Sequence, residues 1–229
     1  MNKYNIICID CPWSFSDKLE MSDVARSSES QYPVLNIEEL KKLRINDIAA
    51  EDALIVSWTP SSLLQEGLDC LKSWNFRQTQ MVVWNKTNKD PFKSIKNKLK
   101  KIDLNDKSNI DKIFNDFNYN DLMGFGMGRM WRNCHEIALV GVRGKIYKHL
   151  KNKSQRTVHF GINEKHSKKP EHIQDQLDLM FPDPSLKKIE VFARRLKEGW
   201  TCIGNEVCSG KDIRESINEL LFDKVCDSI

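Results

Sequence analysis

Short apolar runs alternate with helical patterns along the chain, and this alternation restricts the fold more than any other feature. Residues 4–9, 53–58 and 80–84 are rich in Ile and Val and are short enough to be buried strands. Helical patterns begin near residues 36 and 61. Further strands are predicted over 137–142, 187–194 and 200–203, and further helices over about 167–181 and 209–222. This order predicts a doubly wound α/β fold with a mostly parallel central sheet and helices on both faces.

The composition is that of one large globular domain. The 229 residues are 40% hydrophobic and 30% charged, which suffices for a real core. No apolar run is long enough to span a membrane, and no signal peptide precedes the first strand. The seven cysteines are scattered and odd in number and form no Cys/His cluster, which favours reduced thiols in the cytoplasm and no metal site. The net charge of +4 is compatible with nucleic acid but is weak support alone.

The first apolar run ends in Asp10-Cys11-Pro12-Trp13, where the proline stops the strand. A carboxylate, a turn carbonyl and an indole thus meet at a strand's carboxyl end, where open α/β sheets bind ligands. This group suits methylation of an exocyclic amine: Asp10 and the Cys11 carbonyl accept its N–H bonds, and Trp13 stacks on the base. The alternative is an ordinary turn, because Asp and Pro are common turn residues.

Two long polar segments interrupt the alternating pattern. We expect the loop 14–36 to fold over a bound base with Tyr32 facing the pocket; an ordinary surface tyrosine is the alternative. Residues 89–122 are rich in Lys, Asn and Asp and predict a basic helical insertion with one apolar stripe. The candidates for phosphate contacts there are Lys93, Lys96, Lys98, Lys100 and Lys101, although such charge runs often only face solvent.

Polar residues also gather where later strands and helices begin. Arg132, Asn133 and Glu136 enter the strand 137–142 as a tight cluster and are candidates for a pocket, with His135 beside them as a structural histidine. Lys169 lies at a helix start, where a cation opposes the helix dipole, so we expect an anionic ligand there.

The last two predicted strands are suited to a nucleoside cofactor. The first of them ends with Arg194, and the second ends at Asn205-Glu206. An acid at a strand end can chelate ribose hydroxyls, as in dinucleotide sites.

These motifs, in this order, give the chain a resemblance to a known family. It resembles the S-adenosylmethionine-dependent adenine-N6 methyltransferases of the MT-A type, in particular their short bacterial and phage members. Asp10-Cys11-Pro12-Trp13 stands for the family's Asp-Pro-Pro-Trp. The other matching segments are 84–88, 128–144, 166–171, 190–194 and 199–206. The similarity therefore extends over nearly the whole chain.

The resemblance implies a Rossmann-like fold, circularly permuted so that the catalytic motif precedes the cofactor-binding strands. It implies one domain over residues 1–229 with an insertion at about 89–122, and S-adenosylmethionine as cofactor. The implied catalytic residues are Asp10, Cys11, Pro12 and Trp13. The implied cofactor contacts are Asp10, Lys169, Glu190, Arg194, Asn205 and Glu206. The implied substrate contacts are Trp13, Tyr32, Lys86, Arg132, Asn133 and Glu136, and from the insertion Lys96, Lys98, Lys100 and Lys101.

The chain departs from the family pattern at two points. Cys11 replaces the first proline of the motif, which keeps the carbonyl but leaves the turn freer. The insertion is longer and more basic than expected, and we expect it to carry substrate recognition, because no separate recognition domain is present.

The expected function is transfer of a methyl group to N6 of an adenine flipped out of DNA. An RNA adenosine methyltransferase is the first alternative. A non-catalytic subunit that keeps the fold as a nucleic-acid platform is the second, and intact Asp10, Trp13, Lys169 and Glu206 argue against it. The expected partner is nucleic acid, not a membrane, and the sequence is compatible with a homodimer or a heterodimer.

Overall fold

The structure is a computed structural model, and it describes residues 3–14, 34–124, 126, 130–162, 169–170, 172–207 and 210–222. Its strands are β1 (Tyr4–Asp10), β2 (Ala49–Thr59), β3 (Arg77–Thr87), β4 (His135–Arg143), β5 (Val158–Ile162), β6 (Lys188–Val191) and β7 (Thr201–Ile203). Its α-helices are α1 (Ile37–Lys41), α2 (Ile45–Ile48), α3 (Leu64–Ser73), α4 (Lys93–Leu99), α5 (Lys107–Asn115), α6 (His172–Met180) and α7 (Ile213–Leu221). Short 3-10 helices are η2 (Ser61–Leu63), η3 (Tyr119–Leu122) and η4 (Ile146–His149).

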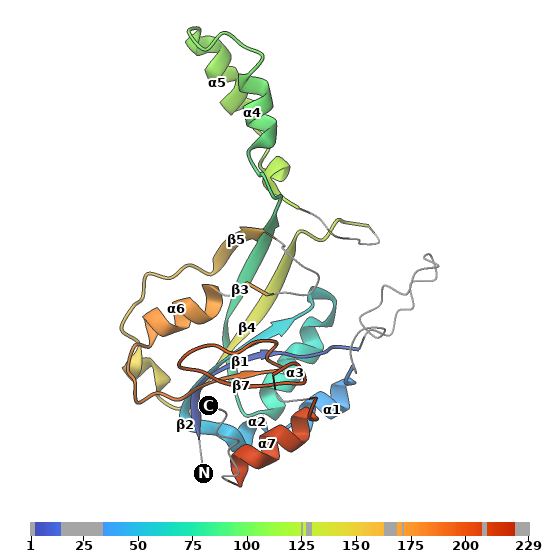
Figure 1. The fold of residues 1–229 in the computed structure, drawn as a ribbon, viewed down its shortest axis with the longest axis vertical. Helices are drawn as coiled ribbons and strands as arrows, with labels where there is room; N and C mark the ends of the chain where they lie inside the picture. The colour runs from blue at the N-terminus through green and yellow to red at the C-terminus, as the bar shows by residue number, and fades with distance from the viewer. Residues whose placement is uncertain are drawn as a thin grey trace. The chain divides into compact units, whose positions relative to one another are not determined.

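The described strands form a seven-stranded sheet in the order β5-β3-β4-β2-β1-β6-β7 (Figure 1). β1 is parallel to both of its neighbours, β2 and β6, and β6 is parallel to β7. β3 and β5 are also parallel, whereas β2 and β4 are antiparallel. The mostly parallel α/β sheet is therefore confirmed. The strand that ends in Asp10 comes first in the chain, and β6 and β7 come last, as the permuted order requires.

The two faces of β1 carry different side chains, because side chains alternate along a strand. Ile7 and Ile9 lie in the main hydrophobic core together with Leu40 of α1, Leu71 of α3 and Ile217 of α7. The intervening side chains of β1 face the opposite side, where α6 is joined to β6 by a hydrogen bond. Helices therefore lie on both faces of the sheet, as the sequence predicts.

The chain separates into two compact units, which we describe one at a time. The first contains Met1–Val82, Ile137–Gln155 and His172–Ile229, and with them β1, β2, β6, β7, α1, α2, α3, α6 and α7. The second contains Val83–Glu136 and Arg156–Glu171, and with them the end of β3, β5, α4 and α5. The single domain expected from the sequence stays a prediction.

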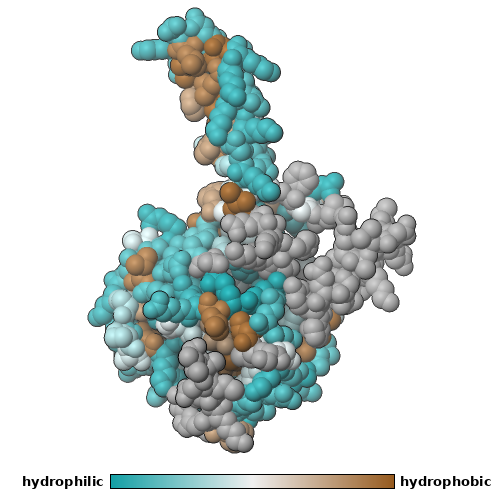
Figure 2. Space-filling view, in the orientation of Figure 1, coloured by the Kyte–Doolittle hydropathy of each residue, from teal (hydrophilic) through white to brown (hydrophobic). Residues whose placement is uncertain are grey.

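The insertion at 89–122 is helical, as predicted, and α4 and α5 form its two main helices (Figure 1). Ile113 of α5 is buried between them, at 7% exposed. Leu104 and Phe114 are more than half exposed, and Figure 2 shows apolar surface gathered over α5. Two short helices cannot bury all of their apolar side chains by themselves.

Local sequence signals predicted the start of α1 correctly and missed the strand β5. Asn36 accepts the Glu39 N–H at 3.0 Å, and the Glu39 carboxylate accepts the Asn36 N–H at 2.9 Å, so the two form a capping box at the expected helix start. The prediction missed β5, because its five residues include a glycine and directly follow a basic segment. The expected helix start near residue 167 lies outside the described residues, and α6 is described from His172. Within the described parts of the chain, no helix has the length and apolar character needed to cross a membrane.

Candidate active site

The Asp10 turn lies at the carboxyl end of β1, as the sequence predicts. Asp10 is the last residue of this strand and is in register with Trp58 of β2. Its side chain is half-buried and shares a face with Cys8, two residues earlier. Cys11, which follows, is only 4% exposed. The acid is therefore the last group of β1 to keep access to solvent before the chain turns into the core.

Trp13 is buried in the first unit and does not present an open stacking surface. Its side chain is 6% exposed, and its indole N–H donates to the Trp58 carbonyl oxygen at 3.0 Å. The backbone N–H of Trp13 donates to the Cys11 carbonyl at 3.0 Å, and the Leu35 N–H donates to the Pro12 carbonyl at 2.9 Å. Burial of this large aromatic surface stabilises the core. The described role of the indole is to anchor the turn, and stacking on a base stays a prediction.

A second carboxylate, that of Glu190 in β6, lies on the same face as Asp10. Glu190 is in register with Cys8 of β1, and Gln174 Nε2 donates to Glu190 Oε2 at 2.9 Å. Burial raises the pKa of Glu190 above its ordinary value, and the charge of Asp10 acts in the same direction. The hydrogen bond from Gln174 and the charge of Arg195 oppose this shift without cancelling it. The first unit thus holds two electrostatically coupled carboxylates, both of them predicted site residues.

The end of β7 packs closely on the segment that follows β6. A Cβ atom at Gly204 would lie 2.4 Å from the Ala193 carbonyl oxygen, so this position has no room for a side chain. Phe192 has a φ of 63°, a strained conformation for a residue that carries a Cβ. The close packing brings together two predicted cofactor residues, because Arg194 Nε lies 3.6 Å from Glu206 Oε1.

The second unit brings together three predicted site residues. Lys86 Nζ is 2.6 Å from Glu136 Oε1, and Lys169 Nζ is 3.1 Å from Glu136 Oε2. Burial acts to raise the pKa of Glu136, but the two ammonium groups outweigh it, so the pKa lies below its ordinary value. Lys86 Nζ also lies 5.4 Å from the centroid of the buried Trp84 ring. The cluster therefore holds an ionised carboxylate between two cations.

The other predicted polar residues are exposed or lie outside the described residues. Arg132 and Asn133 are exposed in the second unit, next to Trp131, which is 83% exposed. Asn205 is exposed in the first unit, beside the Arg194–Glu206 pair. Tyr32 lies outside the described residues, so its pocket role stays a prediction.

The lysines of the insertion are all exposed but do not share one face of α4. An α-helix turns by about 100° per residue, so Lys93, Lys96 and Lys100 form one row along the helix. Lys98 points away from this row, and Lys101 lies beyond the helix end. Of the five candidate lysines, Lys93, Lys96 and Lys100 thus share one helical face.

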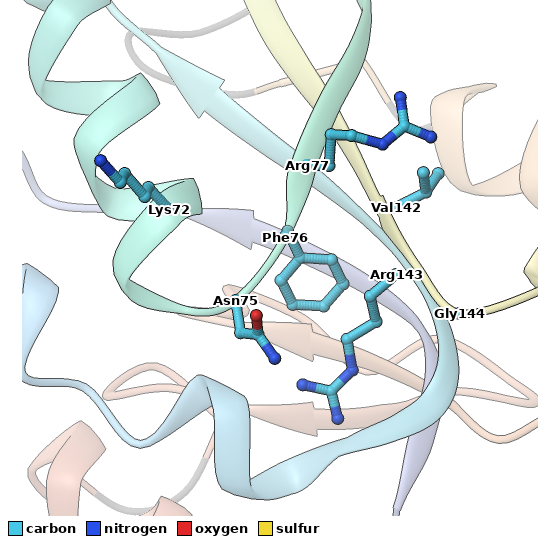
Figure 3. A pocket seen from close by; sticks show the side chains of 7 residues that line it. All are labelled: Lys72, Asn75, Phe76, Arg77, Val142, Arg143 and Gly144. Carbon is cyan, nitrogen blue, oxygen red and sulfur yellow. The ribbon is translucent and has the colours of Figure 1, made fainter.

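A cleft of about 370 Å³ lies in the first unit at the opposite end of the strands from Asp10 (Figure 3). It is lined by Lys72, Asn75, Phe76, Arg77, Val142, Arg143 and Gly144. Arg143 stacks on the Phe76 ring at 5.4 Å and donates to the carbonyl oxygens of Ala49 and Ala50, both at 2.6 Å. Arg143 therefore ties β4 to the start of β2, and its guanidinium is engaged in the fold.

Gln174 and Arg195 are the site residues that the sequence prediction missed. An Arg195 guanidinium nitrogen donates to Gln174 Oε1 at 3.1 Å, while the other end of the amide donates to Glu190. Gln174 is 5% exposed, and a buried amide requires partners for both ends. The available signal was a polar residue within the apolar stripe of α6, between Ile173 and Leu177.

A protein-family model matches most of this chain. The family model that matches the chain is described as MT-A70, and it covers residues 4–107 and 116–206. This match contains the Asp10 turn, the strand that carries Glu190, and Glu206 after β7. The unmatched residues 108–115 make up most of α5.

The curated relatives include a Type II methyltransferase and subunits of adenosine methyltransferases. The Type II methyltransferase M.MunI of Mycoplasma sp is 26% identical over 224 residues, which are 91% of this chain and 80% of that protein. The human N(6)-adenosine-methyltransferase catalytic subunit METTL3 is 20% identical over 210 residues, which are 90% of this chain and 29% of that protein. The N6-adenosine-methyltransferase non-catalytic subunit MTB of Arabidopsis thaliana is 30% identical over 88 residues, 38% of this chain and 11% of that protein. This chain thus spans most of M.MunI but less than a third of these plant and animal relatives. Because the family model matches most of the chain, the chain belongs to the MT-A70 family of adenine-N6 methyltransferases.

Proposed function

We propose that this protein transfers a methyl group from S-adenosylmethionine to N6 of adenine in DNA. The observation that carries the proposal is the Asp10 turn at the carboxyl end of β1, on the same face as the half-buried Glu190. The choice of DNA is supported by the match to the Type II methyltransferase M.MunI, of which this chain spans 80%. A target adenine is flipped out of the duplex at a cost of a few kcal/mol.

The carboxylates of the first unit fit a cationic cofactor. S-adenosylmethionine carries a sulfonium and an ammonium group, and when bound it supplies an electrophilic methyl group. Asp10 and Glu190 place two carboxylates on one face of the sheet, and burial makes the charged form of Glu190 costly. A cation bound between the two carboxylates offsets the cost of burying the charge of Glu190 and reduces the repulsion between Asp10 and Glu190.

Further cofactor contacts are proposed for residues at the end of β7 and in the second unit. Arg194 and Glu206 are ion-paired side chains whose polar groups suit the nucleoside portion, with Asn205 beside them. Lys169 is proposed as a cofactor contact because of its family motif. Its ammonium group forms an ion pair with Glu136 in the second unit.

The Asp10 turn is proposed to hold the adenine amine. The N6 lone pair is delocalised into the purine ring, so the amine is a weak nucleophile. Asp10 and the Cys11 carbonyl each accept one N–H bond; the Cys11 oxygen keeps a second lone pair beside its bond from Trp13. Because Pro12 and Trp13 anchor the turn, catalysis comes from positioning rather than from a covalent intermediate. Asp10 is the proposed acceptor of the proton that N6 loses.

The proposed substrate contacts outside this turn carry positive charge and hydrogen-bonding groups. In the second unit they are Lys86, Arg132, Asn133 and Glu136, together with Lys96, Lys98, Lys100 and Lys101 of the insertion. Tyr32 is retained from the family motif. Lysines that contact phosphates contribute affinity without reading sequence, so these residues are expected to position the nucleic acid.

Methyl transfer by the purified protein tests the proposal. With labelled S-adenosylmethionine, we expect incorporation into duplex DNA and a loss of turnover of at least about 100-fold in the Asp10→Ala variant, since positioned groups contribute on this order. Calorimetry on the same variant is expected to show that cofactor affinity falls far less than turnover. Labelling of RNA but not of DNA would contradict the choice of substrate.

Two other functions have some support among the relatives. An RNA substrate is suggested by METTL3, although this chain spans only 29% of that protein. A non-catalytic role is suggested by the relative MTB, although the match covers only 38% of this chain. A non-catalytic subunit is expected to bind no S-adenosylmethionine in calorimetry, whereas the enzyme binds it.

Cellular location and assembly also remain proposals. Among the described residues, Cys8, Cys11, Cys70, Cys134 and Cys202 are not joined in disulfides, which is compatible with the reducing cytoplasm. A homodimer or a heterodimer with a related subunit is proposed on the basis of the relatives that are named as subunits.

A further inference from the structure

We propose that Gln174 and Arg195 form a positioning relay that holds the Glu190 carboxylate in one orientation as the acceptor for the cationic part of the cofactor. This inference rests on the proposed function, because it assigns Glu190 to the cofactor site. Gln174 and Arg195 are positioning residues, since they act through Glu190.

The geometry of the relay fixes which end of the amide faces the carboxylate. An arginine side chain can only donate hydrogen bonds, so its contact with Gln174 at 3.1 Å selects the amide oxygen. The amide NH2 group is then turned toward Glu190, where it donates at 2.9 Å. Without Arg195, the amide could rotate and bring its oxygen against the carboxylate, which is a repulsive contact. Arg195 therefore determines the orientation of Gln174, and Gln174 determines that of Glu190.

The surroundings of Glu190 explain why such a relay is needed. From β1, Cys8 is in register with Glu190 and Asp10 adds a negative charge; from β7, Cys202 is in register on the other side. Lys197, which follows β6, adds a positive charge together with Arg195. Burial and Asp10 raise the pKa of Glu190, whereas Gln174, Arg195 and Lys197 lower it. Loss of the relay should therefore let Glu190 take up a proton at a higher pH and lose its attraction for a cation.

The first test is Gln174→Met, with Gln176→Met on the same helix as the matched control. Methionine keeps the length of the side chain but removes the hydrogen bond to Glu190. In the cofactor-free protein, a carbon-13 titration of the glutamate carboxyl groups should show a higher pKa for Glu190 in Gln174→Met and no change in Gln176→Met. At pH 7, calorimetry should show S-adenosylmethionine affinity about tenfold weaker in Gln174→Met, as loss of a charged hydrogen bond predicts. Its decline on acidification should begin at a higher pH than in the wild type.

The second test separates orientation from mere packing at Arg195. Arg195→Lys keeps a donor and a positive charge, so it should retain most of the affinity, whereas Arg195→Met should resemble Gln174→Met. Equal losses in both Arg195 variants would overturn the relay, because packing alone would then explain them. An unchanged Glu190 pKa in folded Gln174→Met would overturn it as well. If the relay variants bind the cofactor like the wild type while Asp10→Ala still abolishes turnover, the relay fails and the proposed function stands. If the wild type binds no S-adenosylmethionine, both fail.

Discussion

At the scale of single residues, Trp13 is the buried side chain that anchors the turn carrying Asp10. The sequence predicts a base-stacking indole, whereas the structure buries it and uses its N–H to bind the Trp58 carbonyl at 3.0 Å. We predict that Trp13→Phe, which removes this donor and part of the buried ring, lowers the free energy of unfolding by about 1–3 kcal/mol. We also expect turnover to fall about tenfold, because the turn that carries Asp10 loses an anchor.

A matched control for this prediction exists in the same core. Trp74 is also fully buried, and its indole N–H donates to the Leu40 carbonyl at 3.0 Å, but it lies at the end of α3 rather than at the Asp10 turn. Trp74→Phe should therefore cost similar stability while leaving turnover at a temperature well below unfolding unchanged. If both variants lose turnover in proportion to stability, Trp13 has no special positioning role. Chemical denaturation and initial-rate measurements on both variants decide this.

At the scale of elements, the α4–α5 insertion is polarised in charge. Residues 91–102 contain five lysines and no acid, whereas residues 103–121 contain five aspartates and two lysines. The part outside the family match, residues 108–115, lies on the acidic side. We therefore expect α4 to contact phosphates and α5 to face away from them. One of the α4 lysines, Lys96, already has a partner in Asp90 at 2.9 Å, an exposed pair that is worth little.

The row formed by Lys93, Lys96 and Lys100 gives a direct test of this orientation. Changing all three to Gln should weaken DNA binding and reduce the slope of log affinity against log salt by up to about 3, because each lost phosphate contact contributes about 0.9. The control changes Lys107 and Lys112 of α5, together with the exposed Lys42 of the first unit, to Gln and alters the net charge equally. Fluorescence anisotropy at several salt concentrations distinguishes the two. Equal slopes in both triple variants would mean that the row is only a solvated face.

At the scale of the whole molecule, local patterns predicted the sheet and the position of Asp10 at the carboxyl end of β1, but not the pairing of side chains. Short apolar strands and the capping box at Asn36 depend on neighbouring residues, so they are visible in the sequence. The same holds for Asp10, since carboxyl ends of parallel strands mark ligand sites. The Gln174–Glu190 bond, the Lys86–Glu136 pair and the burial of Trp13 join distant parts of the chain, and no local signal specifies such partners.

These contacts between distant parts of the chain shift the pKa values of two partly buried carboxylates in opposite directions. The pH dependence of the stability of the whole molecule should show both shifts. The pKa of Glu136 is lowered in the folded protein, so its ionisation adds stability above its unfolded value of about 4.3, and this contribution is lost as the pH falls through the folded pKa. The pKa of Glu190 is raised, so stability is lost as the pH rises from about 4.3 through the folded pKa. At neutral pH the charged Glu190 therefore destabilises the folded protein.

The same substitution at the two positions should therefore have opposite effects. At pH 7, Glu136→Gln leaves Lys86 and Lys169 without their shared carboxylate and should lower Tm, whereas Glu190→Gln removes a costly charge and should raise Tm. Each change is expected to be roughly 2–4 °C, or about 1 kcal/mol for a chain of this size. Scanning calorimetry from pH 7 to pH 3 should show both differences shrinking as the wild-type carboxyls become neutral. Glu190→Gln should at the same time weaken cofactor binding, because the charge that destabilises the empty fold is the charge that the cofactor requires. A lower Tm in both variants would show that the two carboxylates serve only as packing.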